Sequence, residues 1–302
     1  MPFVKANGIE IAYEEFGEAR APAILLTMGL GVQLIAWPEP FCKGLADRGF
    51  RVIRYDNRDV GLSTKINGGP PPDIGAAFAN LMSGKPVAAP YKLGDMAQDA
   101  VGLLDGLGIA KAHIVGVSMG GMISQLVAAD FPQRTSSLVS IMSTSGDPSV
   151  PPGKPEAMAV LMGPRPDPKD REAVMAHSMN TLRVIAGPGY PLEEAELRRR
   201  VEAAVDRSYY PPGLARQLVG ILASGSRVEA LKRIRVPTLV IHGDEDPLVP
   251  IEGGRHTAAQ IPGARLEIIP RMGHDLSAPL LPRLVDLIAT HCADADRLKL
   301  AS

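Results

Sequence analysis

Cysteine is scarce in this sequence, and long apolar runs are missing. The two cysteines, Cys42 and Cys292, lie far apart and outside any C-x-x-C spacing, which argues against a disulfide framework or a structural metal site. No stretch approaches the roughly eighteen consecutive apolar residues of a membrane helix, and Met1 to Glu10 lack the pattern of a signal peptide. We therefore expect a cytoplasmic protein that holds no metal and does not insert into a membrane.

An excess of charge of one sign is also missing. The chain carries 32 basic and 33 acidic residues, for a formal net charge of -1, and these are spread along its length. A nucleic-acid partner requires a concentrated basic face, which this distribution does not provide. The expected partner is a small molecule, and assembly into a homodimer stays open.

Apolar residues are plentiful, at 45% of 302 residues, and they fall into short runs typical of buried strands. An Asn7-Gly8 turn indicates an antiparallel hairpin that joins Phe3 to Ala6 with Ile9 to Glu15. Six further strands are predicted, and together with the hairpin they make an eight-stranded, mostly parallel sheet: Ala23 to Thr27, Arg51 to Tyr55, His113 to Val117, Ser137 to Met142, Thr238 to His242 and Leu266 to Ile269.

Segments with helical spacing alternate with these strands, which favours an α/β fold with helices on both faces of the sheet. They are Phe41 to Asp47, Met96 to Leu107, Met119 to Asp130, Glu252 to Gln260 and Leu280 to His291.

The alternation stops between residues 145 and 231, where proline-rich connections are followed by helical patterns alone. The chain then returns to a strand of the same sheet, so an insertion explains the interval better than a separate domain. We predict a core of residues 1–144 and 232–302 that carries a helical cap, or lid, of residues 145–231.

Gly116 to Gly120 match the G-x-S-x-G pattern, with Ser118 at the centre. The pattern follows a predicted strand and precedes a predicted helix, which is the context of a nucleophile held on a sharp turn. A phosphate-binding loop would require a following Lys-Ser/Thr pair, and none is present. Ser118 is therefore the candidate nucleophile.

A serine hydroxyl needs a base at neutral pH, and His274 is the best placed of the six histidines. It lies on a loop after the last strand, where open α/β sheets collect reactive groups. The acid that orients it is expected after the strand that ends at His242, where Asp244, Glu245 and Asp246 compete. Pro247 biases the residue before it toward an extended backbone, which favours Asp246.

Two backbone N–H groups are predicted to form an oxyanion hole, those of Leu30, in the glycine-rich loop after the first parallel strand, and of Met119. An ordinary glycine-rich turn is the alternative. Methionines of the cap suggest an apolar site and a hydrophobic or bulky substrate. The residues predicted to contact substrate are Gly29, Trp37, Met122, Tyr209 and Tyr210.

With these residues in place, the chain resembles the α/β-hydrolase superfamily, and within it the aclacinomycin methylesterase-like group of capped esterases. The resemblance is carried by Met28-Gly29, Ile53 to Asp56, Val117 to Gly120 and Met272 to His274. It implies ester hydrolysis by a serine, a histidine and an aspartate without a cofactor. Leu30-Gly31 stands where that group has a Gly-Asn pair, so the group's anthracycline substrate is not implied.

The sequence therefore predicts a carboxylesterase that works through an acyl-enzyme intermediate. Perhydrolase, lactonase and carbon–carbon bond hydrolase activities would use the same three side chains and stay open. A ligand-binding protein on the same fold is a more remote alternative, since all three members of the expected triad are present.

Overall fold

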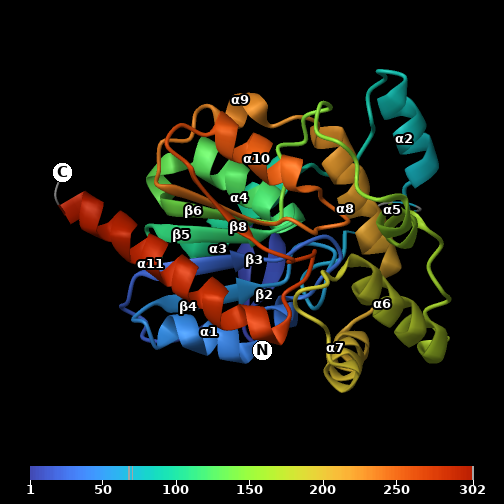
Figure 1. The fold of residues 1–302 in the computed structure, drawn as a ribbon, viewed down its shortest axis with the longest axis horizontal. Helices are drawn as coiled ribbons and strands as arrows, with labels where there is room; N and C mark the ends of the chain where they lie inside the picture. Colours follow the sequence, from blue (N-terminus) through green and yellow to red (C-terminus); the bar gives the residue numbers. More distant parts are fainter. Residues whose placement is uncertain (67–68, 70, 301–302) are drawn as a thin grey trace.

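A single eight-stranded sheet organises the molecule, in the order β1-β2-β4-β3-β5-β6-β7-β8 (Figure 1). The computed structural model describes residues 1–66, 69 and 71–300. Only β1 with β2 and β2 with β4 pair antiparallel, and every other neighbouring pair is parallel. The predicted α/β fold with a mostly parallel eight-stranded sheet is confirmed. The strands are β1 Phe3–Ala6, β2 Ile9–Phe16, β3 Ala23–Thr27, β4 Arg51–Tyr55, β5 Ala112–Val117, β6 Thr135–Ile141, β7 Thr238–Gly243 and β8 Arg265–Ile269.

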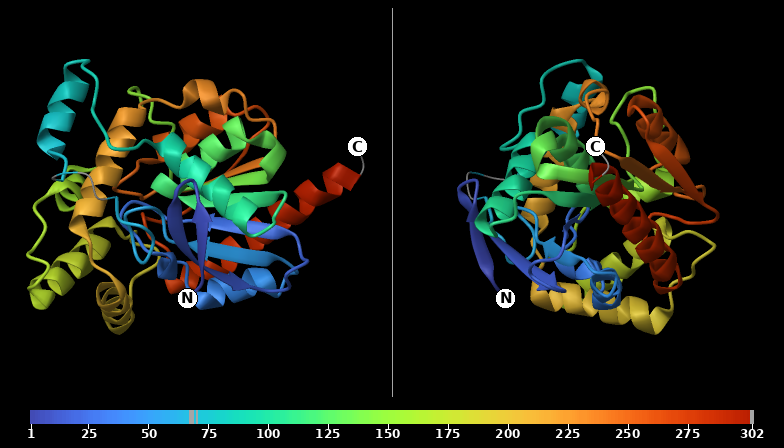
Figure 2. Two further views of the ribbon diagram at one scale, coloured as in Figure 1. Left: turned by 180° about the vertical axis from the view of Figure 1, so that it is seen from behind. Right: turned by 90° about the vertical axis from the view of Figure 1, so that its left-hand side faces the viewer.

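Helices cover both faces of the sheet (Figures 1 and 2). One layer contains α1 and α11, which pack against each other, and the opposite layer contains α3 and α4. None of the helices in the described part of the chain is both long and apolar enough to cross a membrane. The helices of the sheet layers are α1 Glu39–Ala46, α3 Leu93–Gly106, α4 Met119–Asp130, α9 Val228–Leu231, α10 Ile251–Gln260 and α11 Leu281–Leu300.

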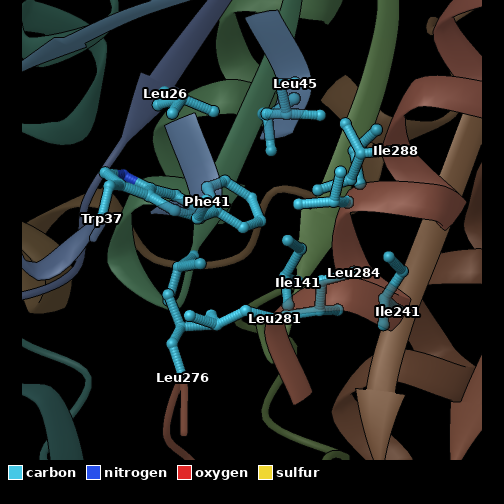
Figure 3. Packing of buried hydrophobic residues seen from close by; sticks show 14 of the residues in the cluster. Leu26, Trp37, Phe41, Leu45, Ile141, Ile241, Leu276, Leu281, Leu284 and Ile288 are labelled. Atoms are coloured by element: carbon cyan, nitrogen blue, oxygen red, sulfur yellow. The ribbon is translucent and has the colours of Figure 1, made fainter. Parts of the chain in front are cut away.

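Alternate residues of the buried strands supply the two halves of the core. Along β3, Ile24 and Leu26 face α1 and α11, whereas Ala23 and Leu25 join the cluster formed with α3 and α4. Figure 3 shows the first cluster, in which Phe41 of α1 lies among residues of the sheet and of α11. Because β3 is buried on both faces, its residues Ala23 to Leu26 form a continuous apolar run.

The segment between β6 and β7 contains helices α5 Pro155–Met162, α6 Arg171–Ile185, α7 Glu194–Arg207 and α8 Pro211–Ser224. They gather at one end of the molecule, on the right in Figure 1. Helices α6 and α7 share a small apolar cluster of Met175, Met179, Leu197 and Val201. Helix α8 instead packs against α3 and against α2 (Ile74–Met82), and α9 packs on α4 and α10.

Candidate active site

Ser118 lies on a sharp turn between β5 and α4. Its backbone adopts φ 55° and ψ −121°, a left-handed conformation that a residue with a side chain rarely takes. Glycines on either side allow this turn to pack closely: a Cβ atom at Gly120 would lie 2.1 Å from the Thr27 carbonyl oxygen, and one at Gly116 would lie 2.1 Å from that of Gly120. The turn holds the Ser118 side chain above the carboxyl end of the sheet.

The three residues predicted as nucleophile, base and acid meet in one hydrogen-bonded chain. Nδ1 of His274 lies 2.8 Å from Oδ2 of Asp246, and Nε2 lies 2.9 Å from the Ser118 hydroxyl oxygen. A carboxylate only accepts, so Nδ1 carries the ring proton and Nε2 is free to accept the hydroxyl proton. The arrangement can therefore remove a proton from Ser118.

Asp246 is held by its own loop as well as by His274. Its Oδ1 accepts hydrogen bonds from the backbone N–H groups of Leu248 (2.9 Å) and Val249 (2.8 Å), and the residue is only 5% exposed. Both carboxylate oxygens are thus satisfied, which fixes the plane in which the carboxylate meets the imidazole.

His242, at the end of β7, supports this loop and was not singled out by the sequence. Its Nε2 donates to the Val249 carbonyl oxygen at 2.8 Å and lies 3.7 Å from Oδ2 of Asp246. Burial lowers the pKa of His242, although the carboxylate of Asp246 acts in the opposite direction. Its position four residues before Asp246 was the one available signal.

Asp275 is a second buried carboxylic acid beside His274. Its Oδ1 accepts a hydrogen bond from the Gly187 N–H at 3.4 Å, and burial raises the pKa of the carboxyl group. The backbone N–H of His274 donates to the Ile185 carbonyl oxygen at 2.8 Å. The end of α6 therefore contacts the histidine loop directly.

The loop after β3, the predicted oxyanion loop, lies against Ser118. A Cβ atom at Gly29 would lie 3.2 Å from that of Ser118. Among the described residues, the N–H groups of Leu30 and Met119, the two predicted donors, have no hydrogen-bond acceptor. Their role as donors stays a prediction.

The predicted substrate-contacting side chains differ in where they lie. Trp37 differs most from the expectation: it is completely buried and stacks on Phe41 with ring centroids 5.1 Å apart, so it has no surface for a ligand. Met122 is also nearly buried, in the cluster with α3. The Tyr210 hydroxyl accepts a hydrogen bond from Arg216, and the buried Tyr209 hydroxyl has no hydrogen-bond partner within the described part of the chain.

A polar loop after β4, which contains Asp56 and Asn57, packs beside the site. Asp56 Oδ1 accepts from the Leu34 N–H at 2.8 Å, and a Cβ atom at Gly61 would collide with the Asp56 carboxylate. Asn57 Nδ2 donates to the Met28 carbonyl oxygen at 2.9 Å. The polar loop thus fixes the start of the predicted oxyanion loop.

Comparison with known proteins agrees with the fold described above. The sequence profile of the alpha/beta hydrolase fold family matches residues 22–278, and the chain belongs to this family. Among the described residues, no group of three or more His, Cys, Asp or Glu side chains could hold a metal ion.

Individual relatives bear out the resemblance to methylesterases. The chain is 30% identical to rhodomycin D methylesterase DnrP of Streptomyces peucetius, over 92% of this chain and 93% of that protein. It is 25% identical to 3-oxoadipate enol-lactonase 2 of Acinetobacter baylyi, over 87% and 86%. A meta-cleavage product hydrolase of Pseudomonas fluorescens IP01 superposes with a TM-score of 0.77, at 22% identity and 98% coverage of both chains, which reflects the shared fold.

Proposed function

We propose that this protein hydrolyses carboxylic esters, with Ser118 as nucleophile, His274 as general base and Asp246 as the acid that orients the imidazole. The observation that carries the proposal is the hydrogen-bonded chain from Ser118 Oγ through His274 to Asp246, at 2.9 and 2.8 Å. The similarity to a methylesterase over nine-tenths of the chain supports the choice of an ester bond.

Each step of the proposed hydrolysis follows from the positions of these three side chains. Ser118 Oγ attacks the ester carbonyl carbon while Nε2 of His274 takes the hydroxyl proton, and the imidazolium is stabilised by Asp246. The N–H groups of Leu30 and Met119 receive the negative charge on the former carbonyl oxygen. The C–O bond breaks as the departing alcohol takes the proton from His274, and a water activated by the same ring then releases the acid from Ser118.

Residues 145–231 are proposed to form a cap over this site, as the sequence suggested. The end of α6 holds the His274 backbone through Ile185, and a side chain of α8 reaches the oxyanion loop, so the segment contacts the site on two sides. Met175 and Met179 lie between α6 and α7 and are core residues of the cap. We propose, as the sequence predicted, that the substrate carries a hydrophobic or bulky acyl or alcohol group.

The deciding experiment compares wild type with Ser118→Ala on nitrophenyl esters of increasing acyl length. The variant should lose on the order of 10⁴- to 10⁶-fold in kcat, because no other group replaces the nucleophile. Ser83→Ala, an exposed serine at the end of α2, should retain wild-type rates. A fluorophosphonate should label Ser118 alone. Equal rates for wild type and Ser118→Ala would refute the proposal.

Lactone hydrolysis is the second candidate, because a lactone is a cyclic ester and an enol-lactonase is among the relatives. The same assay with a lactone substrate distinguishes a lactonase from an esterase of open-chain substrates. A lactonase would show kcat/KM at least about tenfold higher, a difference of about 1.4 kcal/mol in transition-state stabilisation, for the ring than for an open ester of equal size.

A further inference from the structure

Gln217 is a buried amide that links α8 to two loops of the core. It is completely inaccessible to solvent. Its Oε1 accepts a hydrogen bond from the Gly31 N–H at 2.8 Å, and its Nε2 donates to the Arg58 carbonyl oxygen at 2.8 Å. Both the oxygen and the nitrogen of the side-chain amide are therefore hydrogen-bonded, and the oxygen holds the loop that contains Leu30.

The geometry of that loop depends on three contacts. Its first carbonyl, that of Met28, is held by Asn57, and the Gly29 carbonyl accepts from the Val32 N–H at 3.2 Å. The third contact is the one from Gln217 to Gly31. Peptide units are planar, so only φ and ψ of Leu30 separate the unit that contains the Gly31 N–H from the unit that contains the Leu30 N–H. Fixing the first unit limits the direction of the second.

Helix α8 is itself held rigidly at this point. Arg216, the neighbour of Gln217, makes two hydrogen bonds of 2.9 Å to the Asp59 carboxylate. A Cβ atom at Gly213 would lie 2.0 Å from the Asp59 carbonyl oxygen, and one at Gly31 would lie 2.7 Å from a methyl carbon of Leu214. The amide of Gln217 consequently has little freedom to shift relative to the oxyanion loop.

We propose that Gln217 is a positioning residue for catalysis, which sets the direction of the Leu30 N–H through Gly31 and so couples the segment between β6 and β7 to the oxyanion site. This inference rests on the proposed esterase function. Gln217 does not touch the reacting atoms in this scheme. Its removal should weaken binding of the transition state and leave binding of the ground-state ester nearly unchanged.

The test is Gln217→Met, which keeps the length of the side chain and removes both hydrogen bonds. Rates are expressed per active site labelled by a fluorophosphonate, so that misfolded protein does not count. We expect kcat to fall by about 10- to 100-fold, less than the hundred- to thousandfold typical of losing an oxyanion donor, because the donor is displaced and not deleted. KM should stay within about threefold.

A trifluoromethyl ketone provides the readout that a purely structural role would not change. Its adduct with Ser118 places an oxyanion in the proposed hole, so its Ki should rise in parallel with the loss of kcat/KM. Ser224→Ala is the matched control, because it removes another hydrogen bond from α8 to the core, between Ser224 Oγ and the Leu93 N–H (3.0 Å). That variant should keep wild-type kcat and Ki.

The outcomes separate this inference from the proposed function. A folded Gln217→Met variant with wild-type kcat and Ki, in a protein that Ser118→Ala inactivates, overturns the role of Gln217 alone. Full activity of Ser118→Ala overturns the esterase mechanism itself. If Gln217→Met does not fold, Gln217→Asn takes its place, since its amide is one methylene too short to reach both Gly31 and Arg58, and the same losses are expected.

Discussion

Three acidic side chains follow β7 in succession, and their surroundings give them different tasks. Asp244 is exposed and accepts a hydrogen bond from the backbone N–H of Arg271. Glu245 is exposed as well, whereas Asp246 is buried against His274. Only a carboxylate shielded from water can hold the ring in one tautomer and stabilise its cation strongly.

We therefore expect Asp246→Asn to lower kcat by on the order of 10³- to 10⁴-fold, because the amide favours the wrong tautomer of His274. Stability should change little, since the side chain keeps its shape. Asp244→Asn is the matched control and should retain more than half of the wild-type rate. Steady-state kinetics on a nitrophenyl ester measure both. A larger loss of kcat in Asp244→Asn than in Asp246→Asn would show that Asp246 is not the acid that orients His274.

At the scale of single elements, the turn that presents Ser118 depends on the glycines in the first turn of α4, which allow the helix to approach β3. A side chain at Gly120 has no room, since its Cβ would meet the Thr27 carbonyl oxygen at 2.1 Å and the Met28 carbonyl oxygen at 2.7 Å. These are backbone atoms of the loop that leads to Leu30. Any relief of the clash must therefore move the oxyanion loop.

Gly120→Ala should consequently reduce the free energy of unfolding by about 1–3 kcal/mol and also reduce turnover. The control is Gly94→Ala in the first turn of α3, where a Cβ atom would meet nothing within 4 Å. This second change should be neutral or stabilise by up to about 1 kcal/mol, as alanine favours a helix more than glycine does. Urea unfolding of both variants checks the difference. Equal stabilities would contradict the close packing of β3 and α4.

The sequence predicts elements well where burial imposes a pattern. Strands β3 and β4 have the predicted bounds because both of their faces are covered. Strand β6 begins two residues earlier than expected, at Thr135, where buried polar residues interrupt the apolar run.

The sequence did not predict helices α2 and α5. Both are short, and α2 has a single buried residue, Ala77, so neither has a strong periodic pattern. Asp73 caps α2 by accepting from the Ala76 N–H, and Pro155 begins α5 at a position that suits proline. These two residues were the available signals.

The residues of the proposed site also differ in whether a local sequence pattern marks them. Ser118, Asp246 and His274 lie in local patterns at strand ends, so the sequence alone could propose them, and their roles stay predictions. The contact between Gln217 and Gly31 joins residues 186 positions apart, and nothing local at Gln217 marks it. The burial of Trp37 likewise depends on its stacking against α1, which pattern analysis does not resolve.

At the scale of the whole molecule, a buried ionic network joins the segment between β6 and β7 to the core. Arg216 of α8 pairs with Asp59, and Tyr91 donates to the same carboxylate at 2.6 Å. Arg207, at the end of α7, pairs with Asp56 at 2.7 Å. Both aspartates are completely buried. Such pairs contribute little net stability relative to apolar packing, but the loss of one partner leaves an uncompensated buried charge.

Arg216→Met should therefore reduce the free energy of unfolding by about 3–5 kcal/mol, because the Asp59 carboxylate remains without its cation. Arg171, which pairs with Asp206 on the surface between α6 and α7, is the matched control, with both side chains more than half exposed. Its change to Met should cost at most about 1 kcal/mol, because water screens the pair. Unfolding in guanidinium chloride compares the stabilities of the two single variants. The double variant Arg216→Met/Asp59→Asn removes both buried charges and should regain part of the stability lost in Arg216→Met. If the double variant is less stable than Arg216→Met alone, then an unpaired Asp59 is not the cause of the destabilisation, and the attachment of α8 to the core depends on shape and not on charge.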